Sequence, residues 1–180
     1  RFMNEKLLLE NLRNVPDYPK KGIQFQDVST LFKNPFCIQE MKRELVRLYE
    51  DKGITKVVGI ESRGFVMGAI LAAELGAGFV MARKPGKLPA ETFKETYEKE
   101  YGYDEIEIHS DAITSEDTVL IHDDLLATGG SMEAVYKLCQ RFNPRHIYIN
   151  FLIELAMEGL NGREFLGSNK DITTLITVSR

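Results

Sequence analysis

The chain has no tryptophan and two cysteines among its 180 residues. Cys37 and Cys139 lie far apart and follow neither the spacing of a metal site nor that of a redox motif. We therefore expect reduced thiols in a cytoplasmic protein. No stretch approaches the ~20 apolar residues that a membrane-spanning helix requires, and no signal-peptide pattern opens the chain. These absences predict no membrane partner.

An excess of positive charge is also missing. Lysine and arginine number 23 against 27 acidic residues, which leaves a net charge of −4. A protein with a general nucleic-acid-binding surface would show a basic excess, so we expect no nucleic-acid partner. Basic residues do gather locally at Arg83, Lys84 and Lys87, which suits a small anionic ligand. The length fits a single domain spanning residues 1–180, and no repeat or low-complexity linker divides it.

Three common nucleotide or nucleophile motifs are absent. The chain contains no GxxxxGK[ST], which disfavours a P-loop kinase or ATPase, and no GxGxxG between a strand and a helix, which disfavours a dinucleotide-binding fold. It contains no GxSxG elbow, and no Ser–His–Asp set stands out. Phosphate binding must therefore come from another kind of loop.

Strands and helices alternate along the chain, which predicts an α/β domain with a mainly parallel central sheet flanked by helices. Apolar runs predict strands at 56–60, 79–82, 119–121, 146–153 and 173–178, and an alternating pattern predicts one at 105–109. Apolar periodicity predicts helices at 3–13, from 34–35 to a stop at Gly53, after Gly64 through Leu75, and at 132–142. Charged or glycine-rich turns follow three of these strands, at 61–64, 83–87 and 123–131. Ligands bind beyond the carboxyl ends of parallel strands, so we expect these turns at one edge of the sheet.

The most informative of these turns lies in VLIHDDLLATGGSM, from Val119 to Met132. Asp123 and Asp124 are expected where the strand ends and its side chains reach solvent. The glycines that follow let a backbone approach a ligand, and the first N–H groups of a helix attract anions. An ordinary strand–loop–helix connection with solvated acids is the simpler alternative. The acids, glycines and hydroxyls occur together, however, which favours a ligand that carries a phosphate and either hydroxyls or a cation.

A long polar stretch covers roughly residues 83–104, and we expect it to be structureless. Such a stretch inside a compact domain is usually functional, often as a lid. A disordered insertion is the alternative. The aromatic residues Tyr97, Tyr101 and Tyr103, together with the strand that follows, favour a flap that orders over a ligand.

Several separate segments resemble the adenine phosphoribosyltransferases, a type I phosphoribosyltransferase family, from Pro16 to about Ile153. The matching segments are DDLLATGG, DYPKKGIQFQDVS, GIESRGF, RKPGKLPAET, YEKEYG and EIHSDAI. The resemblance implies the type I fold, with a flexible flap at about 83–104 and a small hood from the N-terminal region. It implies transfer of 5-phosphoribosyl from phosphoribosyl pyrophosphate (PRPP) to adenine, giving AMP and pyrophosphate in purine salvage. It further implies a homodimer and a Mg²⁺ ion held mainly through PRPP, with no protein ligand assigned.

The resemblance also assigns the PRPP site. Asp123 and Asp124 would lie at the ribose hydroxyls, and the 5′-phosphate would be held by Ala127, Thr128, Gly129, Gly130 and Ser131. The pyrophosphate would lie by Glu61, Ser62 and Arg63, a loop in which the family often has a cis peptide bond that does not involve proline. Arg83, Lys84 and Lys87 would supply cations to this leaving group, some of them for a neighbouring subunit.

The base site follows from the same resemblance. Phe25 would stack on the purine, backbone groups around Ile23 and Gln24 would recognise its edge, and Arg63 would be a second contact. Glu100, with Tyr101 beside it in the flap, would exchange a proton with adenine N7; a solvated flap glutamate is the alternative. A flap-shielded carboxyl could have the raised pKa that this role requires.

Two positions depart from the family pattern. Gln26 stands where the family usually has arginine, and losing that charge would weaken binding of PRPP or pyrophosphate. His122 replaces a usually apolar residue, and we expect it to pack against the sheet.

Two other functions remain open from the sequence. The first is transfer to another purine, such as hypoxanthine, guanine or xanthine, against which the LLATGG and RKPGKLP wording argues. The second is a regulator that senses PRPP without catalysis; such proteins often carry an added DNA-binding module, for which we find no spare segment.

Overall fold

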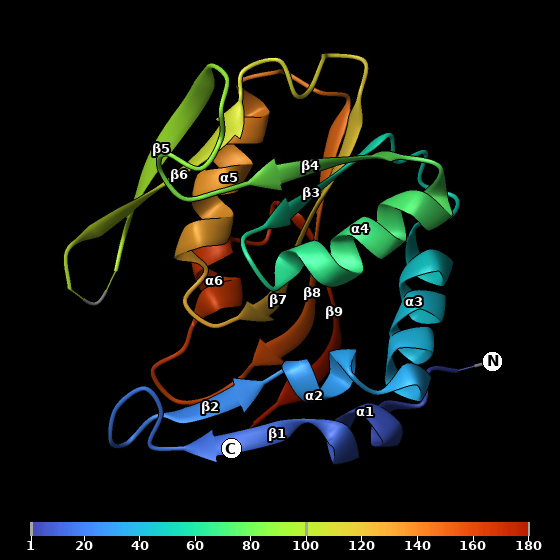
Figure 1. The fold of residues 1–180 in the computed structure, drawn as a ribbon, viewed down its shortest axis with the longest axis vertical. Coiled ribbons are helices and arrows are strands. Elements are labelled where there is room, and N and C mark those ends of the chain that lie inside the picture. Colours follow the sequence, from blue (N-terminus) through green and yellow to red (C-terminus); the bar gives the residue numbers. More distant parts are fainter. Residues whose placement is uncertain (1, 100, 180) are drawn as a thin grey trace.

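The computed structural model describes residues 2–99 and 101–179. Its centre is a five-stranded sheet in the order β4-β3-β7-β8-β9, in which every neighbouring pair is parallel (Figure 1). The strands are β3 (Lys56–Ile60), β4 (Gly78–Ala82), β7 (Thr118–Leu126), β8 (His146–Leu155) and β9 (Asp171–Val178). The predicted α/β class with a mainly parallel sheet is confirmed.

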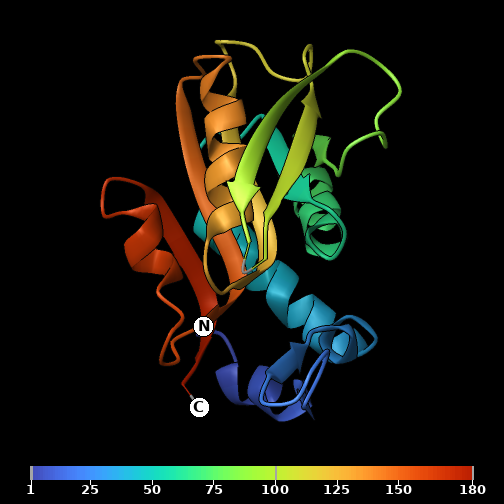
Figure 2. The same ribbon diagram turned by 90° about the vertical axis from the view of Figure 1, so that its left-hand side faces the viewer.

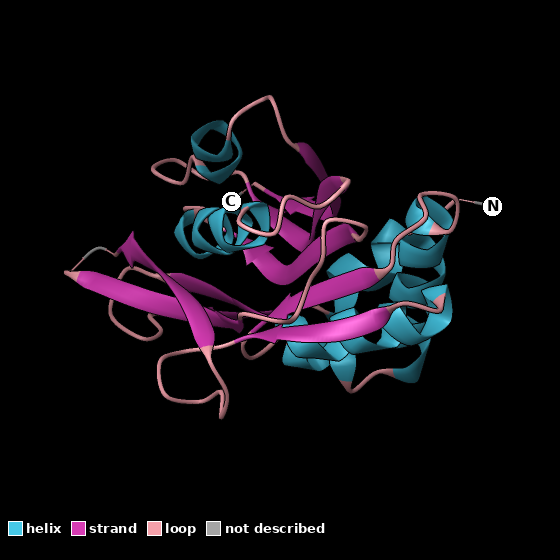
Figure 3. Cartoon of the chain, turned by 90° about the horizontal axis from the view of Figure 1, so that it is seen from above, coloured by secondary structure: helices cyan, strands magenta, loops and turns pink. Residues whose placement is uncertain are grey.

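Helices cover both faces of this sheet. One face carries α3 (Pro35–Tyr49) and α4 (Gly64–Leu75), with α1 (Glu5–Asn11) and α2 (Ser29–Phe32) beside them, and the other carries α5 (Gly130–Gln140) (Figure 3). Two helix ends follow the predicted signals. The Asn34 side chain accepts hydrogen bonds from the first N–H groups of α3, and Gly76 ends α4 in the left-handed conformation, with φ 68°.

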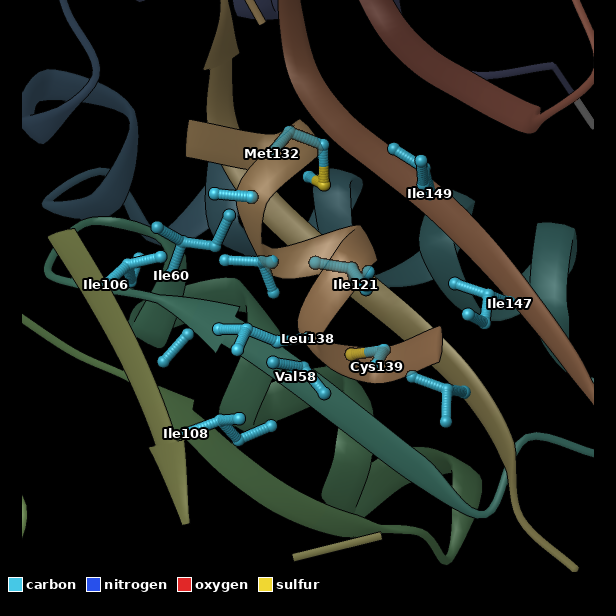
Figure 4. Packing of buried hydrophobic residues seen from close by; sticks show 14 of the residues in the cluster. Val58, Ile60, Ile106, Ile108, Ile121, Met132, Leu138, Cys139, Ile147 and Ile149 are labelled. Atoms are coloured by element: carbon cyan, nitrogen blue, oxygen red, sulfur yellow. The ribbon is translucent and has the colours of Figure 1, made fainter. Parts of the chain in front are cut away.

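Neighbouring residues of the central strands enter two separate cores, because side chains alternate across a strand. Val58 and Ile121 face α5, and their neighbours Val57 and Leu120 face α3 and α4 (Figure 4). All four are fully buried. Fully burying such a side chain contributes about 1.5–3 kcal/mol. The sheet is therefore held rigidly between the two helix layers, and its carboxyl edge is a fixed platform.

The signature strand is longer than predicted. An end after Ile121 is wrong, because β7 continues to Leu126 and pairs with β8 as far as Leu126 and Glu154. Asp123 and Asp124 are thus strand residues. Asp124 is only 3% exposed, so the expectation that it reaches solvent is also wrong. After His122 the burial alternates: Asp124 and Leu126 are buried, whereas Asp123 and Leu125 are partly exposed. Asp124 can be buried because a partner described below neutralises it.

The polar stretch at 83–104 is not structureless, as we had expected. Its second half forms a hairpin with the next predicted strand: β5 (Thr92–Glu98) pairs antiparallel with β6 (Tyr103–His109) (Figure 2). Along β5, residues at odd positions are partly buried and those at even positions from 94 to 98 are exposed. The inward side chains include Glu95, so hydrophobicity alone gives a weak strand signal here. We call residues 83–109 outside the central sheet the flap.

The N-terminal region forms the hood, a two-stranded antiparallel ribbon of β1 (Arg13–Pro16) and β2 (Gln24–Asp27). It lies beneath the carboxyl ends of β7 and β8 in Figure 1. Neither strand was predicted, since each has four residues, the first ends in Pro16, and the loop between them contains Pro19. A further short helix, α6 (Gly162–Leu166), was also missed. No helix within residues 2–99 and 101–179 is both long and apolar enough to span a membrane.

Candidate active site

A cavity of about 370 Å³ lies at the carboxyl edge of the sheet. It is lined from three successive turns and the flap: Glu61, Ser62 and Arg63 after β3, Lys84 after β4, Asp123, Asp124 and Ser131 from β7 and α5, and Tyr97 from β5. Since β4, β3 and β7 are adjacent parallel strands, their carboxyl ends meet at one place. The predicted meeting of the three turns at one edge is what the structure shows.

Asp124 is neutralised by Arg63, whose Nε donates to Asp124 Oδ2 at 2.6 Å. Asp123 Oδ1 accepts from the Asp124 N–H at 2.8 Å. Burial, and then the neighbouring Asp124 carboxylate, raise the pKa of the Asp123 carboxyl well above its ordinary value. Burial lowers the pKa of Arg63, but the Asp124 carboxylate outweighs this and raises it on balance. The pair of acids is therefore poised to accept hydrogen bonds or a cation.

Close packing of α4 sets the position of Asp123. A methyl group at Gly64, the first residue of α4, would lie 2.9 Å from His122 O and 3.0 Å from Asp123 Oδ1. Real Cβ atoms do not approach backbone this closely, so the absence of a side chain lets the helix sit directly on the strand. The matching segment GIESRGF contains Gly64, but the sequence did not predict that Gly64 packs against Asp123.

The phosphate loop, residues 127–131, runs from the end of β7 into α5. Gly129 precedes the helix with φ 88°, and no side chain caps the first turn of α5. The first N–H groups of α5 are therefore free of side-chain caps, which an anion-binding helix start requires. Gly162 supports this loop from behind: a methyl group there would lie 2.6 Å from Ala127 O. Gly162 was missed from the sequence because only tertiary packing brings it to the loop.

The two hydroxyls of the phosphate loop face different spaces. Ser131 lines the cavity with the acids, whereas Thr128 lines a neighbouring cavity of about 380 Å³, together with Gly130. Tyr97 lines both cavities and stands between them. The sequence placed Thr128 and Ser131 together at one phosphate and gave Tyr97 no role.

The turns after β3 and β4 are joined by Glu61. Its Oε1 accepts from Arg83 Nε at 3.0 Å and from the Lys84 N–H at 3.1 Å. Burial raises the pKa of Glu61, but these hydrogen bonds and the charges of Arg83 and Lys87 outweigh it, so the pKa is lowered on balance. The peptide bond between Glu61 and Ser62 is cis, as the resemblance implies. The cationic turn is therefore anchored to the loop proposed for pyrophosphate.

The hood places Phe25, the residue predicted to stack on the base, next to Arg63. The Arg63 guanidinium lies 5.8 Å from the Phe25 ring centroid, and Tyr18 packs edge-on against Phe25 at 5.1 Å. Arg63 therefore touches both the aromatic ring of the hood and the acid of β7. The backbone N–H of Ile23 donates to Lys20 O and its carbonyl accepts from Tyr18, which shapes the loop before Gln24.

The hood also meets the tip of the flap. Lys20 Nζ lies 5.0 Å from the ring centroid of Tyr101, a residue that is 77% exposed. The hood and the flap therefore meet at this point. Glu100, the proposed proton-transfer residue, lies outside the described residues.

Gln26, the departure after Phe25, points to the other face of β2. It is 7% exposed, and its Nε2 donates to Asn14 Oδ1 at 2.9 Å. The Asn14 amide in turn donates to Gln24 Oε1 at 2.9 Å. A neutral amide fits this hydrogen bond to Asn14, which gives the glutamine a role in holding the hood ribbon together.

His122, the second departure, is fully buried against the sheet, as expected. Its Nδ1 lies 2.8 Å from Asn150 Oδ1, and Asn150 Nδ2 donates to Thr173 Oγ1 at 2.9 Å. Within the described part of the chain, its Nε2 has no hydrogen-bond partner. Burial lowers the pKa of His122 to about 4, although Asn150 and the Asp124 charge act in the other direction.

This buried histidine makes stability depend on pH. Between about pH 6.5 and pH 4 the unfolded chain takes up a proton that folded His122 does not bind, so the free energy of unfolding should fall by about 3 kcal/mol as the pH decreases through this window. Urea unfolding at several pH values would measure the slope. His122→Val should remove most of it, and an equal slope in the variant would contradict the assignment.

Within residues 2–99 and 101–179, no group of three or more His, Cys, Asp or Glu side chains is arranged to hold a metal ion.

Comparison with known proteins decides the family. The phosphoribosyl transferase domain family matches residues 27–162. An adenine phosphoribosyltransferase of Phocaeicola vulgatus is 61% identical over 98% of this chain and 100% of its own length. The chain belongs to the adenine phosphoribosyltransferase family. It is therefore a transferase of the pentosyl class within the type I phosphoribosyltransferase fold.

Solved members of this family share the whole architecture. The Rhodothermus marinus adenine phosphoribosyltransferase is 45% identical, with a TM-score of 0.89 over 96% of this chain and 97% of its own. The Giardia lamblia enzyme, solved in complex with 9-deazaadenine, is 40% identical, with a TM-score of 0.91 over 99% and 100%.

Proposed function

We propose that the chain transfers the 5-phosphoribosyl group of PRPP to adenine, the reaction of its family, with the cavity at the carboxyl edge as the active site. The observation that carries this assignment is the position of Arg63. Its guanidinium bonds to Asp124 at 2.6 Å and lies against the Phe25 ring at 5.8 Å. Arg63 thus lies between Asp124, which can accept hydrogen bonds from ribose hydroxyls, and Phe25, which can stack on a planar base.

The reaction exchanges one bond at C1 of the ribose. The C1–O bond to pyrophosphate breaks as adenine N9 bonds to C1, and the purine loses a proton. Positive charge develops on the sugar and negative charge on pyrophosphate, so positioning and electrostatic stabilisation should account for most of the catalysis. We assign the proton at N7 to Glu100, a carboxyl group on the flap.

Different residues bind the ribose, the 5′-phosphate, the pyrophosphate and the adenine. Asp123 and Asp124 accept hydrogen bonds from the ribose hydroxyls, and the N–H groups of residues 127–131 hold the 5′-phosphate at the start of α5. Glu61 holds Arg83 and the Lys84 backbone in place, and Lys84 and Lys87 attract the pyrophosphate. Phe25 stacks on adenine, with Ile23, Gln24 and Arg63 at its edge.

The adjacent carboxylates suit a divalent cation that arrives bound to PRPP. The negative charge of Asp124 disfavours a second negative charge on Asp123 and helps to raise the pKa of the Asp123 carboxyl. A cation near the two carboxylates would offset this repulsion. Mg²⁺, held mainly by the oxygens of PRPP, would neutralise charge on the departing pyrophosphate.

A cytoplasmic homodimer is the setting that we propose for this enzyme. Both cysteines are buried and unpaired, and burial raises the pKa of each thiol, which suits a reducing compartment. Met81 is 42% exposed on β4, which ends the central sheet, next to the cationic turn. This exposed apolar side chain beside that turn supports a neighbouring subunit there.

The direct test offers the purified protein PRPP, Mg²⁺ and one purine base at a time, and follows pyrophosphate release. Adenine should be the preferred base over hypoxanthine, guanine and xanthine. A preference for one of the others would replace the proposal by a second purine transferase. PRPP binding without turnover of any base would point to a regulator.

A further inference from the structure

Tyr97 lies on the inward face of flap strand β5 and belongs to none of the roles assigned above. It is partly buried and packs against the core between the sheet and α5. Its position alternates with the exposed residues Thr96 and Glu98, so the strand register turns the ring toward the sheet. The hairpin pairing of Tyr97 with Asp104 fixes that register.

The ring rests on the phosphate loop. A methyl group at Gly130 would lie 3.5 Å from Tyr97 Cδ2 and 3.4 Å from Glu98 O, so β5 passes directly over the start of α5. The two cavities described above meet at this ring: one contains Asp123 and Ser131, the other Thr128. A phosphate on the loop would therefore have Tyr97 beside it.

The hydroxyl has a carboxylate oxygen of the flap as its hydrogen-bond contact. Its oxygen is 3.5 Å from Asp104 Oδ2, and the charge of Asp123 also acts on it. Burial, then the carboxylates of Asp104 and Asp123, raise the pKa of the Tyr97 phenol, so it stays protonated. The Asp104 contact is at the outer limit of hydrogen-bond length, which leaves the O–H available to a better acceptor.

We propose that Tyr97 is a further PRPP-binding residue, whose phenol donates a hydrogen bond to the 5′-phosphate from the flap side. The proposal rests on the proposed function, since it places this phosphate at residues 127–131. It adds a second consequence. Glu100 follows Tyr97 by three residues in the same flap, so the 5′-phosphate would help to hold the flap that carries the proton-transfer group.

The test is Tyr97→Phe, which keeps the ring on Gly130 and removes the donor. A hydrogen bond to a charged group is strong enough that its loss should raise KM for PRPP about 10-fold or more. Affinity for AMP, which keeps the 5′-phosphate, should fall by a similar factor in titration calorimetry. Affinity for inorganic pyrophosphate, which lacks this phosphate, should be unchanged.

Tyr103→Phe is the matched control, because Tyr103 lies on the same hairpin and is 71% exposed; it should leave all three quantities unchanged. Unaltered KM and AMP affinity in Tyr97→Phe would overturn the proposal, and so would a loss confined to pyrophosphate, which would place the phenol at the leaving group. A wild-type protein that does not use PRPP would instead refute the proposed function. Equal circular dichroism and melting temperature of the two variants would show that folding is intact.

Discussion

Replacing Gly64 by alanine should lower kcat/KM by about 100-fold while the protein still folds. The new methyl group would meet His122 O at 2.9 Å and Asp123 Oδ1 at 3.0 Å. Two of its three nearest neighbours are backbone atoms, so α4 or β7 has to move. A shift of about 1 Å at a catalytic group costs on the order of 100-fold in rate. Steady-state kinetics with PRPP and adenine would measure the loss.

Stability should also decrease, although alanine is the better helix former by about 1 kcal/mol. Overpacking of a tight contact costs about 1–3 kcal/mol, and here it opposes and exceeds that gain. Gly78→Ala is the matched control, since its methyl group would meet the flexible Lys56 side chain at 3.2 Å. Full activity in Gly64→Ala would show that the contact does not position Asp123.

Replacing Glu100 by glutamine should lower kcat by about 100-fold or more and leave KM for PRPP nearly unchanged. General acid–base catalysis contributes about 100- to 10,000-fold, and an amide cannot exchange the N7 proton. Most of the proposed PRPP-binding groups lie on β7, α5 and the turn after β3, outside the flap, so substrate affinity should persist. Stopped or coupled assays over a range of PRPP concentrations would separate the two constants.

The control for this variant is Glu98→Gln, which changes the same charge at an exposed position of the same flap. It should keep wild-type turnover. If Glu100→Gln turns over as fast as the wild type, the glutamate is a solvated flap residue and the proton leaves by another route.

Local sequence patterns predicted most of the central elements. The strand at 56–60 agrees with β3 at both ends, and the helix through Leu75 ends where α4 does, because β-branched runs, apolar periodicity and the stop at Gly76 are local signals. The hood ribbon and the β5 strand were missed for the converse reason. Their strands are short or polar, and pairing with a distant segment is what stabilises them.

The features of the site also fall into those that the sequence predicted and those that depend on tertiary contacts. The identity of the donor could be read from DDLLATGG, since an anion cradle is made by contiguous backbone at one strand–helix junction. The burial of Asp124 could not be read, because Arg63 lies 61 residues away along the chain. Gly162 and Tyr97 were missed likewise, since their neighbours in the phosphate loop are distant in sequence.

The sequence by itself determined the class of fold and the family, and it predicts the phosphate loop, because each depends on periodicity or on a contiguous motif. Tertiary structure decided which groups surround that loop: a buried ion pair between Arg63 and Asp124, a helix pressed on Asp123, and a flap tyrosine over Gly130. The physical reason is that close packing and charge neutralisation depend on distances between elements, and a chain sets those distances only once it has folded.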